Sequence, residues 1–282
     1  MQVVPSGQTC GAIVSGLDLR EPLAPARLEA LRQAWLKHQV IGIVGQSLSV
    51  DDLERFAPQI GPWGDDPFIA ALPGHPHVVE VRREPDEQAP LFADNWHSDW
   101  SFLGSPPAAT MLYGSVVPPV GGDTLFANLH AAWEALPPAM QARIAPLQGI
   151  HSASRSYSKK GRYGEADKGR SMTIKSSDDA LATQTHPLVR THPETGRKAL
   201  FVSPAYTVGI EGMPEDEAKS LLAELCAHAG EERFVYRHTW QPGMLTLWDN
   251  RCLNHRATGG YEGHRRLLHR ITIGERSLAP AP

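Results

Sequence analysis

The stretch 248–273 constrains the fold most, because it joins a polar loop, a glycine-rich turn and a strand with two arginines on one face. His255 lies in the loop, and the turn separates it from the strand-like run 265–273. Successive side chains of a strand point to opposite faces, so Arg266 and Arg270 share a face. Two guanidinium groups on one face need anions, and arginine is suited to bidentate binding of carboxylates.

The remaining sequence predicts many short strands and a few helices. Glycine and proline are frequent, at 25 and 24 of 282 residues, which suits turns between strands better than a helical bundle. Apolar periodicity and capping residues predict helices at 25–38, from the cap Ser49 to about 59, at 129–144 with a break at the proline pair, and at 214–230. We therefore expect a mainly β fold with flanking helices, an antiparallel barrel or jelly roll.

Composition narrows the classes of partner. The net charge of −4 gives no sign of a nucleic-acid or membrane partner. No apolar run reaches the roughly 18 residues that a membrane span needs, and the N-terminus does not look like a secretory signal. Three widely spaced cysteines favour reduced thiols and a cytoplasmic location. We expect one domain over 1–282, with a polar, mobile lid-like insertion at about 152–185.

A second motif lies far upstream of His255. In His97-Ser98-Asp99, an imidazole and a carboxylate are separated by one residue, so on one strand edge both would face the same cation. Two histidines and one carboxylate form the facial triad of non-haem Fe(II) oxygenases, which leaves metal positions open. The triplet alone is weak evidence, and it gains weight from His255 and from the arginine strand that follows.

Six segments in a fixed order then resemble a known family. They are 95–99 (Asn-Trp-His-Ser-Asp), 121–125 (Gly-Gly-Asp-Thr-Leu), 186–193, 199–202, 248–251 and 255–270. Together they resemble the TauD/TfdA family of Fe(II)- and 2-oxoglutarate-dependent dioxygenases. The resemblance covers roughly residues 95–274 and implies a double-stranded β-helix, the jelly-roll fold expected above.

The resemblance also implies the chemistry and its residues. Iron would bind His97, Asp99 and His255, and the distal carboxylate of 2-oxoglutarate would bind Arg266 with help from Thr124. With O2 as oxidant, such an enzyme hydroxylates a C–H bond and releases succinate and CO2. Related halogenases have Ala or Gly at the position of Asp99, so hydroxylation is expected here.

The substrate side resembles the family less closely. Arg270 matches the residue near the acidic end of the substrate, although it could instead add to the 2-oxoglutarate site. The asparagine that helps hold taurine is replaced by Ala93. In taurine dioxygenase a histidine also helps hold taurine, and the segment that carries it corresponds roughly to 61–64, which has no histidine. We therefore expect a carboxylate or sulfonate other than taurine, in a pocket shaped by four residues: Arg270, Trp100, Asn95 and Tyr206.

Other functions stay open at this point. The chain could be a tailoring oxygenase for a secondary metabolite or an amino-acid-derived substrate. It could be a zinc or iron enzyme of another class on a similar barrel, but Arg266 and Thr124 would then lack a purpose. It could be a catalytically silent binding protein, but such a protein would not need an intact triad. The sequence does not decide whether the chain assembles with copies of itself.

Overall fold

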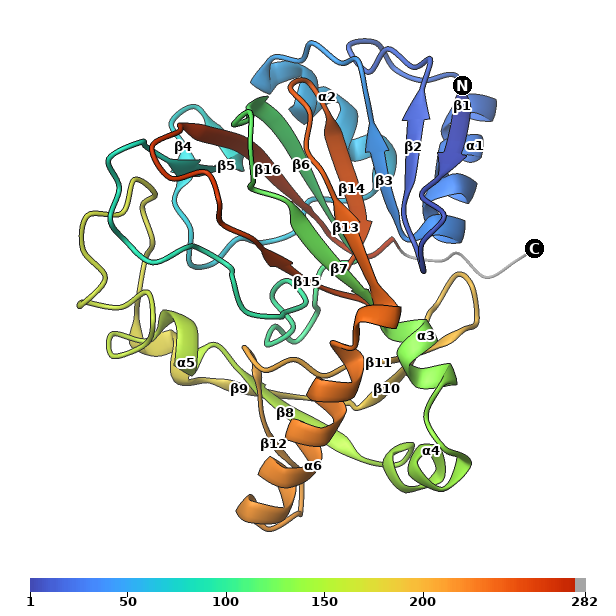
Figure 1. The fold of residues 1–282 in the computed structure, drawn as a ribbon, viewed down its shortest axis with the longest axis vertical. Coiled ribbons are helices and arrows are strands. Elements are labelled where there is room, and N and C mark those ends of the chain that lie inside the picture. The colour runs from blue at the N-terminus through green and yellow to red at the C-terminus, as the bar shows by residue number, and fades with distance from the viewer. Residues whose placement is uncertain (277–282) are drawn as a thin grey trace.

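The computed structural model describes residues 1–276, and its largest feature is an eight-stranded sheet (Figure 1). The strands follow one another across this sheet in the order β1 (Gln2–Pro5), β2 (Ala12–Ser15), β3 (Val40–Ile43), β14 (Leu245–Asp249), β6 (Ala109–Val116), β16 (Arg266–Ile273), β5 (His75–Arg83) and β4 (Ala71–Leu72). Neighbouring strands are antiparallel except β2 and β3.

A second, three-stranded sheet packs against this one. Its strands are β13 (Val235–His238), β7 (Thr124–Asn128) and β15 (Leu253–Ala257), with β7 in the middle. Phe126 of this sheet packs against Trp248 of the large sheet, with ring centroids 5.6 Å apart, and both share a buried cluster with Leu268. Two facing antiparallel sheets around one core make a jelly roll, so the predicted double-stranded β-helix is confirmed.

Smaller elements surround the jelly roll at one end, in the lower half of Figure 1. They are the sheet of β8 (Gln148–Ser152), β9 (Thr183–Pro187) and β12 (Thr207–Ile210), the hairpin of β10 (Val189–Thr191) and β11 (Lys198–Leu200), and helices α3 (Leu129–Glu134), α4 (Pro138–Ile144), α5 (Ser154–Tyr157) and α6 (Glu215–Ala229). The short 3₁₀ helices η1 (Asp178–Leu181) and η2 (Glu232–Phe234) complete the elements.

The outer face of the large sheet is covered by α1 (Pro25–His38) and α2 (Val50–Ile60). The predicted helix at 25–38 is confirmed, and Ser49 caps α2 in a capping box with Asp52. The break in the predicted helix at 129–144 separates α3 from α4, because proline stops one helix and suits the first turn of the next.

Alternation along β16 divides its side chains between the two faces of the sheet. Leu268 lies in the inner cluster between the two sheets, whereas Ile271 and Ile273 pack outward beneath the helices. Arg266 and Arg270 are both buried on the same face as Leu268, as alternation predicts, while Leu267 and His269 on the opposite face are only half-buried. The strand therefore carries two charged side chains into the interior of the barrel.

Two expectations about local structure are wrong. Residues 152–185 are not a plain loop, because the segment includes α5 and η1 and buries Tyr157 and Tyr163 in an aromatic cluster. His97 and Asp99 do not lie on one strand edge. His97 forms an isolated β-bridge with His255, and Asp99 follows in a turn.

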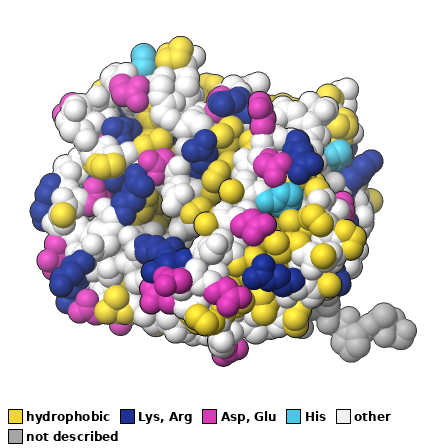
Figure 2. All heavy atoms as spheres, turned by 60° about the horizontal axis from the view of Figure 1, so that its bottom comes forward, with side chains coloured by type: hydrophobic (Ala, Val, Ile, Leu, Met, Phe, Trp, Pro, Cys, Tyr) yellow, Lys and Arg dark blue, Asp and Glu magenta, His cyan; other side chains and the backbone are white. Residues whose placement is uncertain are grey.

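The surface carries charges of both signs. On the face shown in Figure 2, acidic and basic side chains are interspersed with apolar ones. Among residues 1–276, no helix combines the length and the apolar character needed to cross a membrane.

Candidate active site

His97 and His255 are held together by their own backbones. The amide of His97 donates to the carbonyl of His255 at 3.0 Å, and the amide of His255 donates back at 2.7 Å. Residues directly opposite in an antiparallel bridge point to the same face. The two imidazole centroids therefore lie 4.2 Å apart, although 158 positions separate the residues in sequence.

Asp99 completes the cluster. Its Oδ1 lies 3.7 Å from Nε2 of each histidine, and the three candidate ligand atoms lie within 4.8 Å of one another. Oδ2 is occupied, because Thr110 donates to it from Oγ1 at 2.6 Å. One carboxylate oxygen is thus held by the protein while the other faces the imidazoles, which suits a monodentate metal ligand.

The protonation states suit a metal ion. His97 donates from Nδ1 to the carbonyl of Asn95 at 2.8 Å, which leaves the Nε2 lone pair free. Burial lowers the pKa of His97 and lowers that of His255 to about 3, so both rings are neutral near pH 7. Burial opposes ionisation of Asp99, but the neighbouring Arg270, with His255 and His97, holds its pKa at about 2. Two neutral imidazoles and one carboxylate fit Fe(II).

Arg266 is a buried cation without a carboxylate partner among the described residues. Its Nη2 donates to the carbonyl of Gly122 at 3.3 Å, and its Nε makes no hydrogen bond. Burial lowers the pKa of this guanidinium, which is the effect expected when a charge loses water without gaining an anion. An unpaired buried charge is costly, so the site fits a carboxylate supplied from outside the chain.

Thr124 lies beside this arginine, on β7. Its Oγ1 accepts a hydrogen bond from the indole Nε1 of Trp240 at 3.0 Å. The turn before Thr124 approaches the glycine-rich turn so closely that a Cβ on Gly121 would lie 2.4 Å from the carbonyl oxygen of Gly260. Gly121 also has a φ of 65°, so both conformation and space require glycine there.

Arg270 is bound by two acidic side chains. Its Nη1 lies 3.3 Å from Oδ1 of Asp99, and its Nε lies 3.4 Å from Oδ1 of Asp66. Its guanidinium carbon lies 4.9 Å from the ring centroid of Trp100, and that indole donates from Nε1 to Asp66 at 2.9 Å. Arg270 therefore joins the candidate metal ligand Asp99 to a second buried carboxylate.

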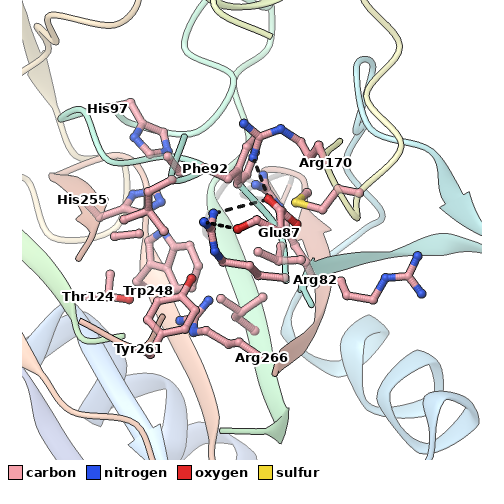
Figure 3. Close-up of a pocket in the computed structure, with 18 residues that line it drawn as sticks. Arg82, Glu87, Phe92, His97, Thr124, Arg170, Trp248, His255, Tyr261 and Arg266 are labelled. Atoms are coloured by element: carbon pink, nitrogen blue, oxygen red, sulfur yellow. Dashed lines mark hydrogen bonds and ion pairs between the residues drawn. The ribbon is translucent and has the colours of Figure 1, made fainter. Parts of the chain in front are cut away.

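A cavity connects the imidazoles with Arg266 (Figure 3). His97 and His255 lie at one end of the labelled set, and Thr124, Tyr261 and Arg266 lie together away from His97. Arg270 also borders this cavity. The two predicted histidine ligands and the predicted co-substrate residues thus share one space.

A second cavity meets the first at Ala93 and His97. Asn95 and Tyr206 line it, and the Tyr206 ring stands edge-on to His97 with centroids 6.0 Å apart. Trp100 lines neither cavity and packs beneath Arg270 instead. Of the four residues expected at the substrate, three therefore border a cavity and Trp100 supports one of them.

Asp66 and Trp240 were missed by the sequence analysis. The segment 61–64, which was expected to match the histidine that holds taurine, has no charged side chain. Just beyond it, however, the carboxylate of Asp66 contacts Arg270 and Trp100. Asp66 has no periodic context that would mark it as a buried residue. Trp240 follows β13, and its hydrogen bond to Thr124 crosses 116 positions of sequence.

Comparison with known proteins shows one consistent likeness. Residues 2–272 match the family described as taurine catabolism dioxygenase TauD, TfdA family. The alpha-ketoglutarate-dependent 2,4-dichlorophenoxyacetate dioxygenase of Burkholderia sp. (strain RASC) is 40% identical over 281 residues, covering 93% of this chain and 91% of the relative.

Two further relatives agree with that match. The (S)-phenoxypropionate/alpha-ketoglutarate-dioxygenase of Sphingobium herbicidovorans is 33% identical, over 91% of this chain and 88% of its own. The crystal structure of a taurine dioxygenase from Burkholderia xenovorans superposes with a TM-score of 0.79 at 31% identity, over 97% of this chain and 91% of that one.

Proposed function

This chain belongs to the TauD/TfdA family of dioxygenases, and we propose that within it the enzyme hydroxylates an organic acid with an apolar, aromatic body. The enzyme depends on Fe(II), 2-oxoglutarate and O2, as the family does. When bound, these supply the oxidising chemistry that converts R–H, O2 and 2-oxoglutarate into R–OH, succinate and CO2. The protein's part is to bind, orient and shield the reactants.

The observation that carries this proposal is the first cavity, which both histidines of the triad share with Arg266. We assign His97, Asp99 and His255 to the metal, because their three ligand atoms converge and are buried in the protonation states that a metal needs. We assign Arg266 and Thr124 to the distal carboxylate of 2-oxoglutarate. The unpaired guanidinium of Arg266 supports that assignment, since a diacid held at the metal would supply the missing anion.

The second cavity supports the aromatic substrate. Tyr157, Tyr163 and Tyr206 line it, and Phe68 and Phe102 pack behind them in the same buried cluster. Aromatic walls favour an aromatic guest through edge-to-face and offset stacking. Relatives with 33–40% identity are named for phenoxyacetate and phenoxypropionate, and we propose an acid of that kind as the substrate.

We propose that Arg270 anchors the acid group of this substrate. It borders the first cavity, and its neighbour Asp99 is a metal ligand in the proposed site. Once the charge of Asp99 is directed to the metal, Arg270 keeps only Asp66 as a full partner and can bind another anion. The alternative is that Arg270 contacts 2-oxoglutarate alone.

A substrate panel scored by succinate release tests these proposals. We expect phenoxyacetate and 2-phenoxypropionate to be turned over at least tenfold better than taurine, and better than their own neutral amides. A preference for taurine would reject the aromatic substrate, whereas equal turnover of acids and amides would reject Arg270 as the anchor. If no acid in the panel gives succinate release that depends on both 2-oxoglutarate and Fe(II), the site assignment is rejected.

We further propose that the chain forms one catalytic domain in which residues 152–185 act as a lid. Tyr157 and Tyr163 bring this segment to the second cavity. Ser171 donates its backbone amide to the buried carboxylate of Glu87 at 2.9 Å, and Arg170 lies near the same carboxylate (Figure 3). The segment 152–185 and the segment that carries Glu87 are therefore joined to each other over the site.

We also propose a cytoplasmic location, because all three cysteines are free thiols.

A further inference from the structure

We propose that Trp240 is a positioning residue for 2-oxoglutarate, which it never touches, because it orients both side chains that bind the distal carboxylate. This inference rests on the proposed roles of Arg266 and Thr124. Trp240 is absent from the walls of the first cavity, yet it contacts Thr124 through its N–H and Arg266 through its ring face. One buried indole thus connects two groups carried by different sheets.

The hydrogen bond to Thr124 fixes the direction of the threonine hydroxyl. An indole N–H can only donate, so Thr124 Oγ1 must act as the acceptor in this 3.0 Å contact. The hydroxyl hydrogen is then free, and the Thr124 hydroxyl donates a hydrogen bond to no group among residues 1–276. A hydroxyl that accepts on one side and keeps its hydrogen on the other is prepared to donate to a carboxylate.

The rings of Trp240 and Tyr261 both lie close to the guanidinium of Arg266. The guanidinium carbon is 5.7 Å from each ring centroid, within the range of a cation–π contact. Among residues 1–276 the guanidinium has only the carbonyl of Gly122 as a hydrogen-bond partner, so few polar contacts fix its plane. Contact with two aromatic rings restricts that plane and leaves its N–H edge free for a carboxylate.

Trp240 is itself held firmly. It is 5% exposed and meets His238 edge-on, with centroids 5.1 Å apart and an interplanar angle of 85°. His238 is fixed in turn by Thr246 at 2.8 Å and by the hydroxyl of Tyr236 at 3.0 Å. The orientation of the indole is therefore set by β13 and β14 before any ligand binds. Preorganisation of this kind reduces the entropy that binding must overcome.

The variant Trp240→Phe keeps an aromatic face toward Arg266 but removes the N–H that orients Thr124. We expect calorimetry on Mn(II)-loaded protein to show 2-oxoglutarate binding about 5- to 10-fold more weakly, the effect of losing about one hydrogen bond. Trp240→Leu also removes the ring and should weaken binding further. Binding of 2-oxovalerate, which has the same chain without the distal carboxylate, should change less than about 2-fold.

Trp133→Phe is the matched control, because Trp133 is also buried but lies in α3, away from both side chains that Trp240 contacts. It should leave the preference for 2-oxoglutarate over 2-oxovalerate unchanged. If Trp240→Phe weakens both oxo acids equally, or neither, the positioning role is wrong. If Trp240→Phe does not fold, Thr124→Val removes the oriented hydroxyl directly, and an unchanged preference in that variant overturns the inference equally.

Arg266→Met separates this inference from the proposed function. Loss of the preference in Arg266→Met together with an unchanged preference in Trp240→Phe would reject only the role of Trp240. An unchanged preference in Arg266→Met would reject the co-substrate site itself.

Discussion

Replacement of Arg266 by methionine should have opposite effects on the free protein and on the protein with co-substrate. In the free protein, this guanidinium is buried with one hydrogen bond at 3.3 Å and no described carboxylate partner. An unpaired buried charge costs roughly several kcal/mol, and two cation–π contacts and one hydrogen bond offset only part of that cost. We therefore expect Arg266→Met to raise the free energy of unfolding by about 1–3 kcal/mol.

Co-substrate binding should show the reverse. Loss of one partner from a buried charge pair costs about 2–5 kcal/mol, or roughly 30-fold to several-thousand-fold in Kd. A concentration of 2-oxoglutarate at 100 times the original Kd stabilises the protein by about 2.7 kcal/mol. With a Kd at least 30-fold higher, the same concentration stabilises Arg266→Met by no more than about 0.9 kcal/mol.

Urea unfolding of metal-free protein measures the first effect, and unfolding of Mn(II)-loaded protein with and without 2-oxoglutarate measures the second. Arg265→Met is the matched control, because Arg265 neighbours Arg266 in sequence but is exposed and forms a surface ion pair with Glu84. That surface pair contributes about 0–1 kcal/mol, so the control should change little. Lower stability of free Arg266→Met, or full stabilisation by 2-oxoglutarate, would refute the reasoning.

Four further predictions follow from the same contacts. His97→Ala should lose both turnover and stoichiometric Fe(II), which metal analysis after dialysis will show, and retention of one equivalent with full activity would contradict the triad. Asp66→Asn removes one of the two carboxylates on Arg270, so the KM for an acidic substrate should fall severalfold while that for its amide stays constant. Trypsin cleavage within 152–185 should slow only when 2-oxoglutarate and a substrate are both present, and an equal rate in all states would argue against a lid. Burial lowers the pKa of His238 to about 4, so the unfolded chain binds a proton at this residue between pH 6.5 and 4 that the folded protein does not. As pH falls through that window, His238 alone should cost metal-free protein up to about 1.4 kcal/mol of stability per pH unit, in addition to the shares of other buried histidines, and His238→Phe should reduce the total slope by that amount.

The fold class and the arginine strand could be predicted from local rules. Alternation alone places Arg266 and Arg270 on one face of β16, and the structure buries both. The proline pair and the Ser49 cap likewise set helix boundaries through backbone chemistry that acts within a few residues. Such features depend on near neighbours, so the sequence displays them directly.

Local rules could not predict the roles of Asp66 and Trp240 or the structure of the segment 152–185. Asp66 gains its role only because folding brings it within 3.4 Å of Arg270, 204 positions away in sequence. The polarity of 152–185 suggested a solvated loop, yet a few aromatic residues in it contribute to a buried cluster. Spacing and periodicity carry no information about such contacts, which depend on the tertiary arrangement.

The charges of the site explain why Arg270 has two acidic neighbours while Arg266 has none among the described residues. In the proposed site, Arg266 faces the distal carboxylate of a dianionic co-substrate that enters with each turnover, so a permanent carboxylate there would compete with it. Arg270 lies beside Asp99. In the proposed site, Asp99 would share its charge with the metal when the metal is bound and would pair with Arg270 alone when it is not. Asp66 keeps Arg270 paired in both states, which limits how strongly the arginine can bind a free anion. An acid with an apolar body that gains further affinity from the tyrosine-lined cavity would then be selected over a small acid held by charge alone.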